Sequence, residues 1–167
     1  MRPETPWLSA HEEHVWRAWT QLNVELSATL QREMQSDANL SISDYEVLVH
    51  LTDSPEGRVR VSDLARMLQW ERSRVSHHLT RMERRGLVQR SECAEDGRGA
   101  YIGVTAAGRS ANEQAAPGHV AAVRRLVFDA LDENDVSRLS VAIDKMLARL
   151  HDVGDGEMST RPAAPAT

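Results

Sequence analysis

The sequence of 167 residues contains one cysteine, Cys93, and few aromatic residues. A single cysteine excludes an internal disulfide and a zinc site built from several cysteines. Phe, Trp and Tyr make up only 4% of the chain, so the core must consist mainly of Leu, Val, Ala and Met. No apolar run approaches the ~20 residues that a membrane span requires. The segment Met1–Trp7 contains two prolines and does not resemble a signal peptide. We therefore expect a cytoplasmic protein with no membrane partner.

Recognisable catalytic motifs are also missing. The sequence has no Gly-rich phosphate loop, no nucleophile elbow and no paired-carboxylate motif. His11 and His14 share a helix face but have no acidic or thiol partner at a metal-binding spacing. These absences argue against an enzyme, and we expect no cofactor and no metal site.

Charge is distributed unevenly along the chain. The formal net charge is −5, which by itself disfavours a nucleic-acid partner. Residues 58–98, however, contain ten arginines and six acidic residues, whereas the rest contains ten basic and nineteen acidic residues. A basic centre between acidic flanks is typical of a DNA-binding protein with a self-associating frame.

Residues 61–105 have the pattern of two short helices followed by a hairpin. We expect a helix over Val61–Leu68 with Ser62 as its N-cap, a turn over Gln69–Glu71, and a second helix over Arg72–Arg85.

Gly86 then stands at the position after the second helix where a positive φ is favoured. Leu87–Ser91 and Ala100–Val104 are expected strands around the turn dipeptide Asp96-Gly97, and Arg58–Val61 can add a third short strand. This order is that of a winged helix-turn-helix.

The second helix carries the signal for DNA binding. Val75, Leu79 and Met82 lie on one face. The remaining surface is polar and suits a major groove. Its candidate DNA contacts are Ser73, Arg74, Ser76, His77, Thr80, Arg81 and Arg84. Arg98, at the hairpin tip, is placed to enter the adjacent minor groove. A merely solvated, Arg-rich face would leave the turn, the glycine and the basic hairpin unexplained.

Long amphipathic helices flank this core. Ser9 and Glu12 form a capping-box pattern at the start of a helix to about Gln35, and Ser43 with Glu46 suggests a second box. After Thr105 a helix is expected to about Leu131, kinked or broken at Pro117.

A final helix follows, from Asp132-x-x-Asp135 to about His151. We expect one domain over residues 9–152, with a core at about 40–105, dimerisation helices at about 9–36 and 106–151, and a disordered tail over 153–167. The fold class is thus mainly α with a small β-hairpin wing.

The run LARMLQWERSRVSHHLTRMERRGLV, followed by DGRGAYIGVTAAG, resembles the DNA-binding core of the MarR family of bacterial transcription regulators. Asp96 and Arg98 match the family's Asp-x-Arg wing, although Gly97, Gly99 and Ala100 stand where relatives often have more basic residues. The likeness extends over roughly residues 9–151.

The resemblance implies a ligand-responsive repressor that binds a pseudo-palindromic operator in double-stranded DNA as a homodimer. It also implies a site for a small aromatic or phenolic effector between frame and core. The candidate residues there are Trp16, Trp19, Tyr45, His50 and His119. For Trp16 and Trp19, core or subunit packing is the competing interpretation.

A winged helix need not bind DNA, because some winged helices serve as protein-interaction modules without sequence-specific DNA binding. That interpretation stays open here. A redox role for Cys93 also stays open, since some relatives use a cysteine as a peroxide switch. Cys93, however, is flanked by acidic residues that raise a thiol pKa, which favours a structural or incidental cysteine. The sequence does not identify the effector, the operator or the regulated genes.

Overall fold

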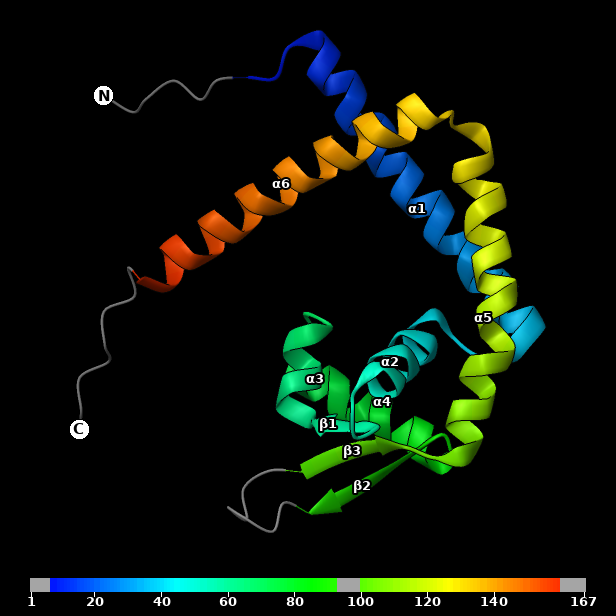
Figure 1. Ribbon diagram of the computed structural model, residues 1–167. Coiled ribbons are helices and arrows are strands. Elements are labelled where there is room, and N and C mark those ends of the chain that lie inside the picture. Colours follow the sequence, from blue (N-terminus) through cyan, green and yellow to red (C-terminus); the bar gives the residue numbers. More distant parts are fainter. Residues whose placement is uncertain (1–6, 93–99, 160–167) are drawn as a thin grey trace. The chain divides into compact units, whose positions relative to one another are not determined.

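The computed structural model describes residues 7–92 and 100–159. The chain divides into two compact units, one up to Val123 and one from Arg124. The helices and strands, shown in Figure 1, are α1 (Ala10–Ala38), α2 (Ile42–Asp53), β1 (Arg58–Arg60), α3 (Val61–Met67), α4 (Arg72–Arg84), β2 (Val88–Glu92), β3 (Ala100–Val104), α5 (Ala106–Leu126), η1 (Phe128–Ala130) and α6 (Glu133–Ser159).

The centre of the first unit is a winged helix, as predicted. Helices α2, α3 and α4 lie beside an antiparallel sheet with the strand order β1-β3-β2. Val59 and Arg90 flank Ile102 in register. Because every helix contributes an apolar face, the core is continuous. Its fully buried side chains include Val47, Leu48, Leu51, Leu64, Val75, Leu79, Met82 and Ile102.

The corner between α4 and β2 depends on Gly86. Its φ is +72°, a left-handed conformation that glycine adopts without a side-chain clash. The N–H of Leu87 donates to the carbonyl of Met82 (3.0 Å), and the N–H of Gly86 donates to that of Glu83 (2.9 Å). These bonds close the helix and turn the chain into the wing, as the sequence predicted.

Two predicted N-caps were wrong. α3 begins at Val61 as predicted, but its N-cap is Arg60, not Ser62, because β1 passes directly into the helix. α2 begins at Ile42, two residues before the start that a cap at Ser43 implies, and its capping box joins Ser41 and Asp44 in place of Ser43 and Glu46. The Ser41 N–H donates to Asp44 Oδ2 (2.9 Å), and the Asp44 N–H donates to Ser41 Oγ (3.0 Å).

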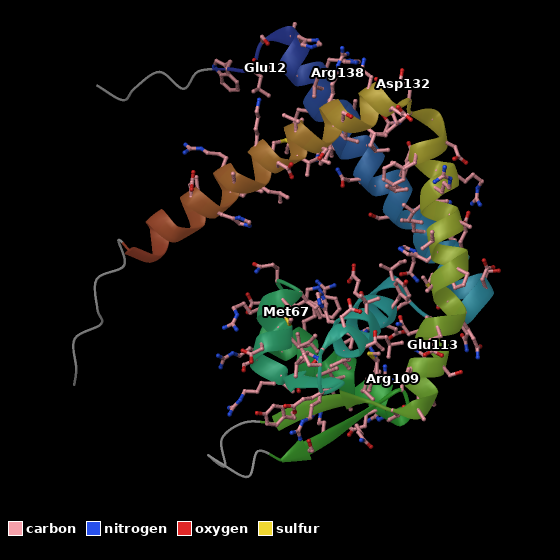
Figure 2. All side chains as sticks on the ribbon, in the orientation of Figure 1. Glu12, Met67, Arg109, Glu113, Asp132 and Arg138 are labelled. Carbon is pink, nitrogen blue, oxygen red and sulfur yellow. The ribbon has the colours of Figure 1, made fainter. Side chains whose placement is uncertain are left out.

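Helix α1 has two environments. It begins at the predicted box of Ser9 and Glu12, the latter labelled in Figure 2, and it continues to Ala38, past the predicted end at Gln35. Near its C-terminal end Met34 is buried, whereas Trp16 and Leu22 in the first half are 61% and 53% exposed.

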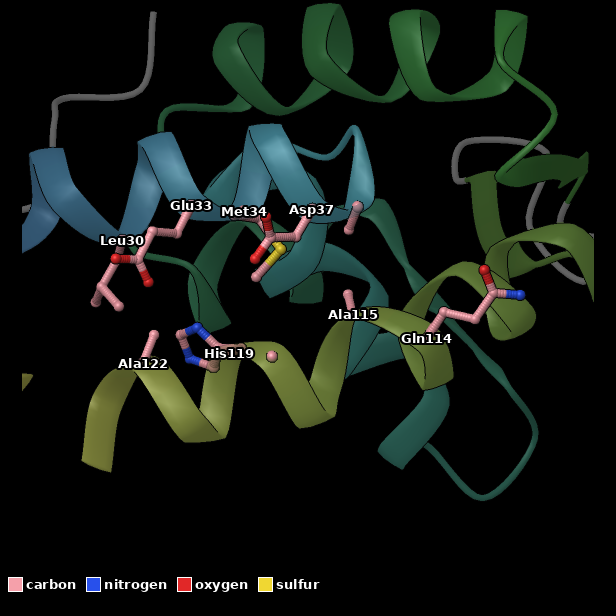
Figure 3. Close-up of a pocket in the computed structure, with 10 residues that line it drawn as sticks. Leu30, Glu33, Met34, Asp37, Gln114, Ala115, His119 and Ala122 are labelled. Carbon is pink, nitrogen blue, oxygen red and sulfur yellow. The ribbon is translucent and has the colours of Figure 1, made fainter. Parts of the chain in front are cut away.

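The buried end of α1 lies against α5. A small cavity of about 40 Å³ remains between the two helices. Residues of both helices line it, and Figure 3 shows them as sticks: Leu30, Glu33, Met34, Asp37, Gln114, Ala115, His119 and Ala122.

Helix α5 starts at the predicted cap, because the N–H of Gly108 donates to Thr105 Oγ1 (3.0 Å). Pro117 lies inside the helix, and α5 is not broken into two helices there. Proline removes one helical hydrogen bond, but buried Ala115 and Ala122 on either side of it anchor both parts of the helix. The α-helix ends at Leu126, and a 3-10 turn completes the segment expected to reach Leu131.

The second unit is built on α6. Asp132, labelled in Figure 2, accepts the N–H groups of Asn134 and Asp135 at 2.8 Å each, so the predicted start is confirmed. The helix continues to Ser159, past the predicted end at His151, because glycines at 154 and 156 weaken a helix without terminating it. Residues 153–159 are therefore helical, and residues 160–167 of the expected tail lie outside the described part. No helix of the described chain combines the length and hydrophobicity needed to cross a membrane.

Candidate nucleic-acid interface

Helix α4 separates its apolar and polar residues as predicted. Val75, Leu79 and Met82 are completely buried. The candidate contact residues lie on the remaining surface, which we call the reading face: Ser73, Arg74, Ser76, His77, Arg81 and Arg84 are exposed, and Thr80 is half-buried. Hydroxyl, imidazole and guanidinium groups on one exposed helix face are the donors and acceptors that base edges and phosphates require.

A strand residue adds to this face. Arg90 of β2 donates from Nη2 to the carbonyl of Ser76 (3.0 Å) and to Thr80 Oγ1 (3.3 Å). Its backbone N–H donates to Glu83 Oε1 (3.1 Å). Sequence reasoning missed Arg90, although its place in register with buried Ile102 puts it on the side of the sheet that faces the helices.

Trp70, in the turn before α4, was also missed. The Arg74 guanidinium lies 4.1 Å from the centroid of the Trp70 ring, a cation–π contact. The same indole meets the imidazole of His78 edge-on, with ring centroids 5.3 Å apart. An aromatic residue one helical turn before an arginine was a usable signal for this stack.

A buried polar cluster lies behind the reading face. His78 is 6% exposed, with Nδ1 2.9 Å from Arg81 Nη2 and Nε2 3.0 Å from Asp44 Oδ1. Asp44 Oδ2 is 2.7 Å from Arg85 Nη1. Burial alone would raise the pKa of Asp44, but His78, the Ser41 backbone N–H and Arg85 together hold it well below its usual range. Asp44 is therefore an anion.

The wing is described at its base only. Tyr101 of β3 has the guanidinium groups of Arg58 and Arg60 at 5.0 and 5.4 Å from its ring centroid. The predicted minor-groove residue Arg98, its neighbour Asp96 and the lone Cys93 all lie outside the described residues.

Three of the five candidate effector residues gather at one groove. Tyr45, His50 and His119 line an open groove of about 840 Å³. The rings of Tyr45 and His119 are 4.8 Å apart. Burial, with a smaller contribution from the charge of Asp53, raises the pKa of the Tyr45 hydroxyl, which stays neutral.

The remaining effector candidates, Trp16 and Trp19, lie apart from this groove. Trp16 borders a shallow depression formed by α1 residues alone, and Trp19 lines neither site. Trp70 and Arg74, by contrast, line the groove and were not predicted there. In the described ranges, no group of three or more His, Cys, Asp or Glu side chains is arranged to hold a metal ion.

Comparison with known proteins places this geometry in a family. The model of the MarR family matches residues 38–99. AbsC from Streptomyces coelicolor, a MarR family transcriptional regulator, is 37% identical with a TM-score of 0.82, over 89% of this chain and 99% of its own. Sco3205 from the same organism, crystallised in complex with DNA, is also 37% identical, with a TM-score of 0.82 over 88% and 91% of the two chains.

A cysteine-to-serine mutant of MarR from E. coli, complexed with operator DNA, is 19% identical with a TM-score of 0.72 over 84% of this chain and 99% of its own, which shows the shared fold alone. No curated protein sequence matches the chain. Members of the matched family are transcriptional regulators and not enzymes. The winged helix, the extent of the alignment and the 37% identity together establish that this chain belongs to the MarR family of transcriptional regulators.

Proposed function

We propose that the chain is a sequence-specific DNA-binding repressor that reads a pseudo-palindromic operator as a homodimer. In each half-site, α4 would enter the major groove and the wing, through Arg98, the adjacent minor groove. The observation that carries the proposal is the reading face: an exposed polar helix surface backed by a fully buried apolar one. The relative Sco3205, crystallised with DNA at 37% identity, supports it.

The test is a selection of duplexes from a random library by the full chain. We expect one two-fold-related motif, with half-sites centred about one helical turn, 10–10.5 bp, apart. Ser73→Ala and His77→Ala, at the centre of the reading face, should change the preferred base at particular positions. Arg84→Ala near the helix end should weaken all sequences alike and make the salt dependence shallower.

Arg32→Ala is the matched control, because this exposed arginine of α1 donates to Thr29 of its own helix and does not belong to the reading face. It should leave the motif unchanged. Arg98→Ala should weaken binding by about 1–3 kcal/mol. A selection that returns no motif would favour a protein-interaction module instead. A transcription reaction from a promoter carrying the motif tests repression, since added protein should lower the transcript.

The homodimer is supported by the exposed apolar residues of α1 and α6. Val15, Trp16 and Leu22 in α1, and Met146 and Leu150 in α6, are all exposed large hydrophobic side chains. Exposed large apolar side chains in such number on a helix usually mark association. Light scattering of the full chain at micromolar concentration should give twice the monomer mass.

Ligand control is the remaining part of the proposal. The groove offers aromatic and imidazole side chains for a planar ring, and Arg74 supplies a cation for a carboxylate or phenolate. An anion that recruits Arg74 would withdraw it from the reading face, so ligand and DNA would compete.

Salicylate is the probe. It should quench tryptophan fluorescence saturably and release the selected duplex, and Trp70→Phe should remove most of the quenching. His50→Ala should weaken both effects, while Trp16→Phe, outside the groove, should leave duplex release unchanged. Release without saturable quenching would contradict this site.

A further inference from the structure

We propose that His78 and Asp44 are positioning residues for DNA recognition: they form a buried imidazole–carboxylate pair that fixes Arg81 on the reading face. The inference rests on the proposed function and extends it to residues that do not themselves reach DNA.

Hydrogen-bond chemistry assigns the proton on His78. A guanidinium group only donates, so His78 Nδ1, 2.9 Å from Arg81 Nη2, must accept. The imidazole is then neutral, with its proton on Nε2, and this nitrogen lies 3.0 Å from Asp44 Oδ1. His78 therefore transmits the position of the carboxylate to the guanidinium.

Asp44 is itself held from two sides. Its carboxylate accepts from the Ser41 backbone N–H (2.9 Å) and from Arg85 Nη1 (2.7 Å), and it is 4% exposed. Ser41 belongs to the start of α2, and Arg85 follows the last residue of α4. The carboxylate is thus fixed in the frame of both helices, which gives His78 a stationary partner.

The imidazole ring is also oriented from the side. Trp70 packs edge-on against His78 at 86° between the ring planes, and Arg74 stacks on the same indole. Two reading-face arginines, Arg74 and Arg81, are therefore held by one cluster that lies behind α4. An arginine held in place before binding loses less rotamer freedom when it meets a base or phosphate.

Stability alone does not account for this cluster. Replacing a buried charged or polar pair by apolar side chains of similar volume is often neutral or stabilising, whereas such a pair can specify one arrangement. The other buried residues of α4, which are Val75, Leu79 and Met82, are all apolar and fully buried. A polar residue at this place suits the orientation of Arg81.

The experiment is a double-mutant cycle in the full chain, using the duplex that the unmodified chain selects from a random library. His78→Leu keeps a side chain of similar volume in the buried position and removes both polar contacts. His78→Gln keeps one acceptor and one donor and serves as the conservative variant. We expect His78→Leu to weaken binding by about tenfold, the size of one ordered side chain, and His78→Gln to restore most of it.

In the Arg81→Ala background, His78→Leu should cause no further loss, because its effect passes through Arg81. Both single variants should lose discrimination at the same base pairs. Additive losses, or discrimination lost at different base pairs, overturn the inference. A wild-type chain that selects no motif overturns the proposed function as well, whereas a motif read equally well by His78→Leu overturns the inference alone.

A second measurement needs no substitution at His78. The nitrogen chemical shifts of its ring in the wild-type protein at pH 7 should report a proton on Nε2 and an unprotonated Nδ1. A proton on Nδ1 contradicts the inference even if His78→Leu fails to fold, because the ring could not then accept from Arg81.

Discussion

The helices of the winged-helix core and the first half of α1 have the same kind of apolar periodicity, but their apolar side chains differ in burial. In the core, Leu48 and Leu79 are completely buried, whereas Trp16 and Leu22 of α1 are more than half exposed. Helix α1 contains both cases, since Met34 near its other end is 5% exposed. Periodicity therefore identifies the apolar face of a helix but not what covers it. The core is covered by this chain, whereas the first half of α1 is exposed and belongs to the surface proposed for the homodimer.

The largest effect is expected at the tightest point of the core. A Cβ added at Gly108 would lie 2.0 Å from the backbone carbonyl oxygen of Leu87, so the corner between α4 and β2 would have to move. Gly108→Ala should lower the free energy of unfolding by about 4 kcal/mol. Urea denaturation measures it.

Gly118→Ala in the same helix is the matched control, because nothing lies within 4 Å of its added Cβ. It should raise stability slightly, by about 0.5–1 kcal/mol, through helix propensity. Equal effects of the two substitutions would show that the contact with Leu87 does not constrain the fold.

The next effect concerns the buried charge behind the reading face. Asp44→Ala should destabilise the chain by about 3 kcal/mol, since Arg85 and His78 lose their shared partner. Asp53→Ala, at the exposed end of the same helix, should change stability little.

The lowered pKa of Asp44 also predicts that the free energy of unfolding depends on pH. Its pKa is lowered in the folded chain, so folding favours the carboxylate, and the resulting stability is fully present above the ordinary Asp value of about 3.9. It should decline as the pH falls below that value toward the folded pKa. Asp44→Asn should show a flatter decline in acid unfolding curves. A wild-type curve with no steeper fall would contradict the pairing of this carboxylate.

A smaller effect, on dimer formation, should distinguish the exposed half of α1 from the winged-helix core most directly. Leu22→Glu places a charge in the exposed stripe of α1 and should weaken the proposed dimer by about 2 kcal/mol while leaving core unfolding unchanged. Gln21→Glu adds the same charge at the neighbouring exposed position and should not alter the mass. Sedimentation at several concentrations is the measurement. Loss of core stability in Leu22→Glu would mean that this stripe is already covered within one chain.

The smallest expected change in stability comes from removing one of two similar capping boxes, at the start of α1 or of α2. Ser41→Ala should cost about 1 kcal/mol, because Ser41 caps α2 beside the buried Asp44. Ser9→Ala removes a fully exposed cap at the start of α1 and should only increase fraying of the first turn. Hydrogen exchange separates local fraying from global unfolding. Equal global costs would show that the start of α1 is as tightly coupled to the core as α2.

Much of the winged helix was predictable because local signals agreed with tertiary packing. Val75, Leu79 and Met82, followed by Gly86, define α4 and its end from sequence alone. The capping boxes show the limit: Ser43 with Glu46 and Ser41 with Asp44 are equally good patterns, and only the packing of Asp44 against His78 selects the second. Local sequence carries no information about that contact, which spans 34 positions of the chain.

The candidate sites were predictable to different degrees. The reading face follows from helical periodicity, so its residues were found. The groove joins residues from α1, α2, α5 and the Trp70 turn, and such a set depends on tertiary folding. Tyr45, His50 and His119 were found through family likeness, while Trp70 and Arg74 join the groove only once the chain has folded. Arg90 was missed because strand alternation alone does not show which helix faces the strand.

The contact between α5 and the α4–β2 corner has a mechanical consequence. Thr105 Oγ1 donates to the carbonyl of Gly86 (2.6 Å), the Thr105 N–H donates to that of Leu87 (3.2 Å), and Gly108 leaves no space for sliding there. The first turn of α5 is thus bonded to the residues that end α4. We therefore expect a tilt of α5 to rotate α4 with it, so that the orientation of the reading face would depend on the orientation of α5.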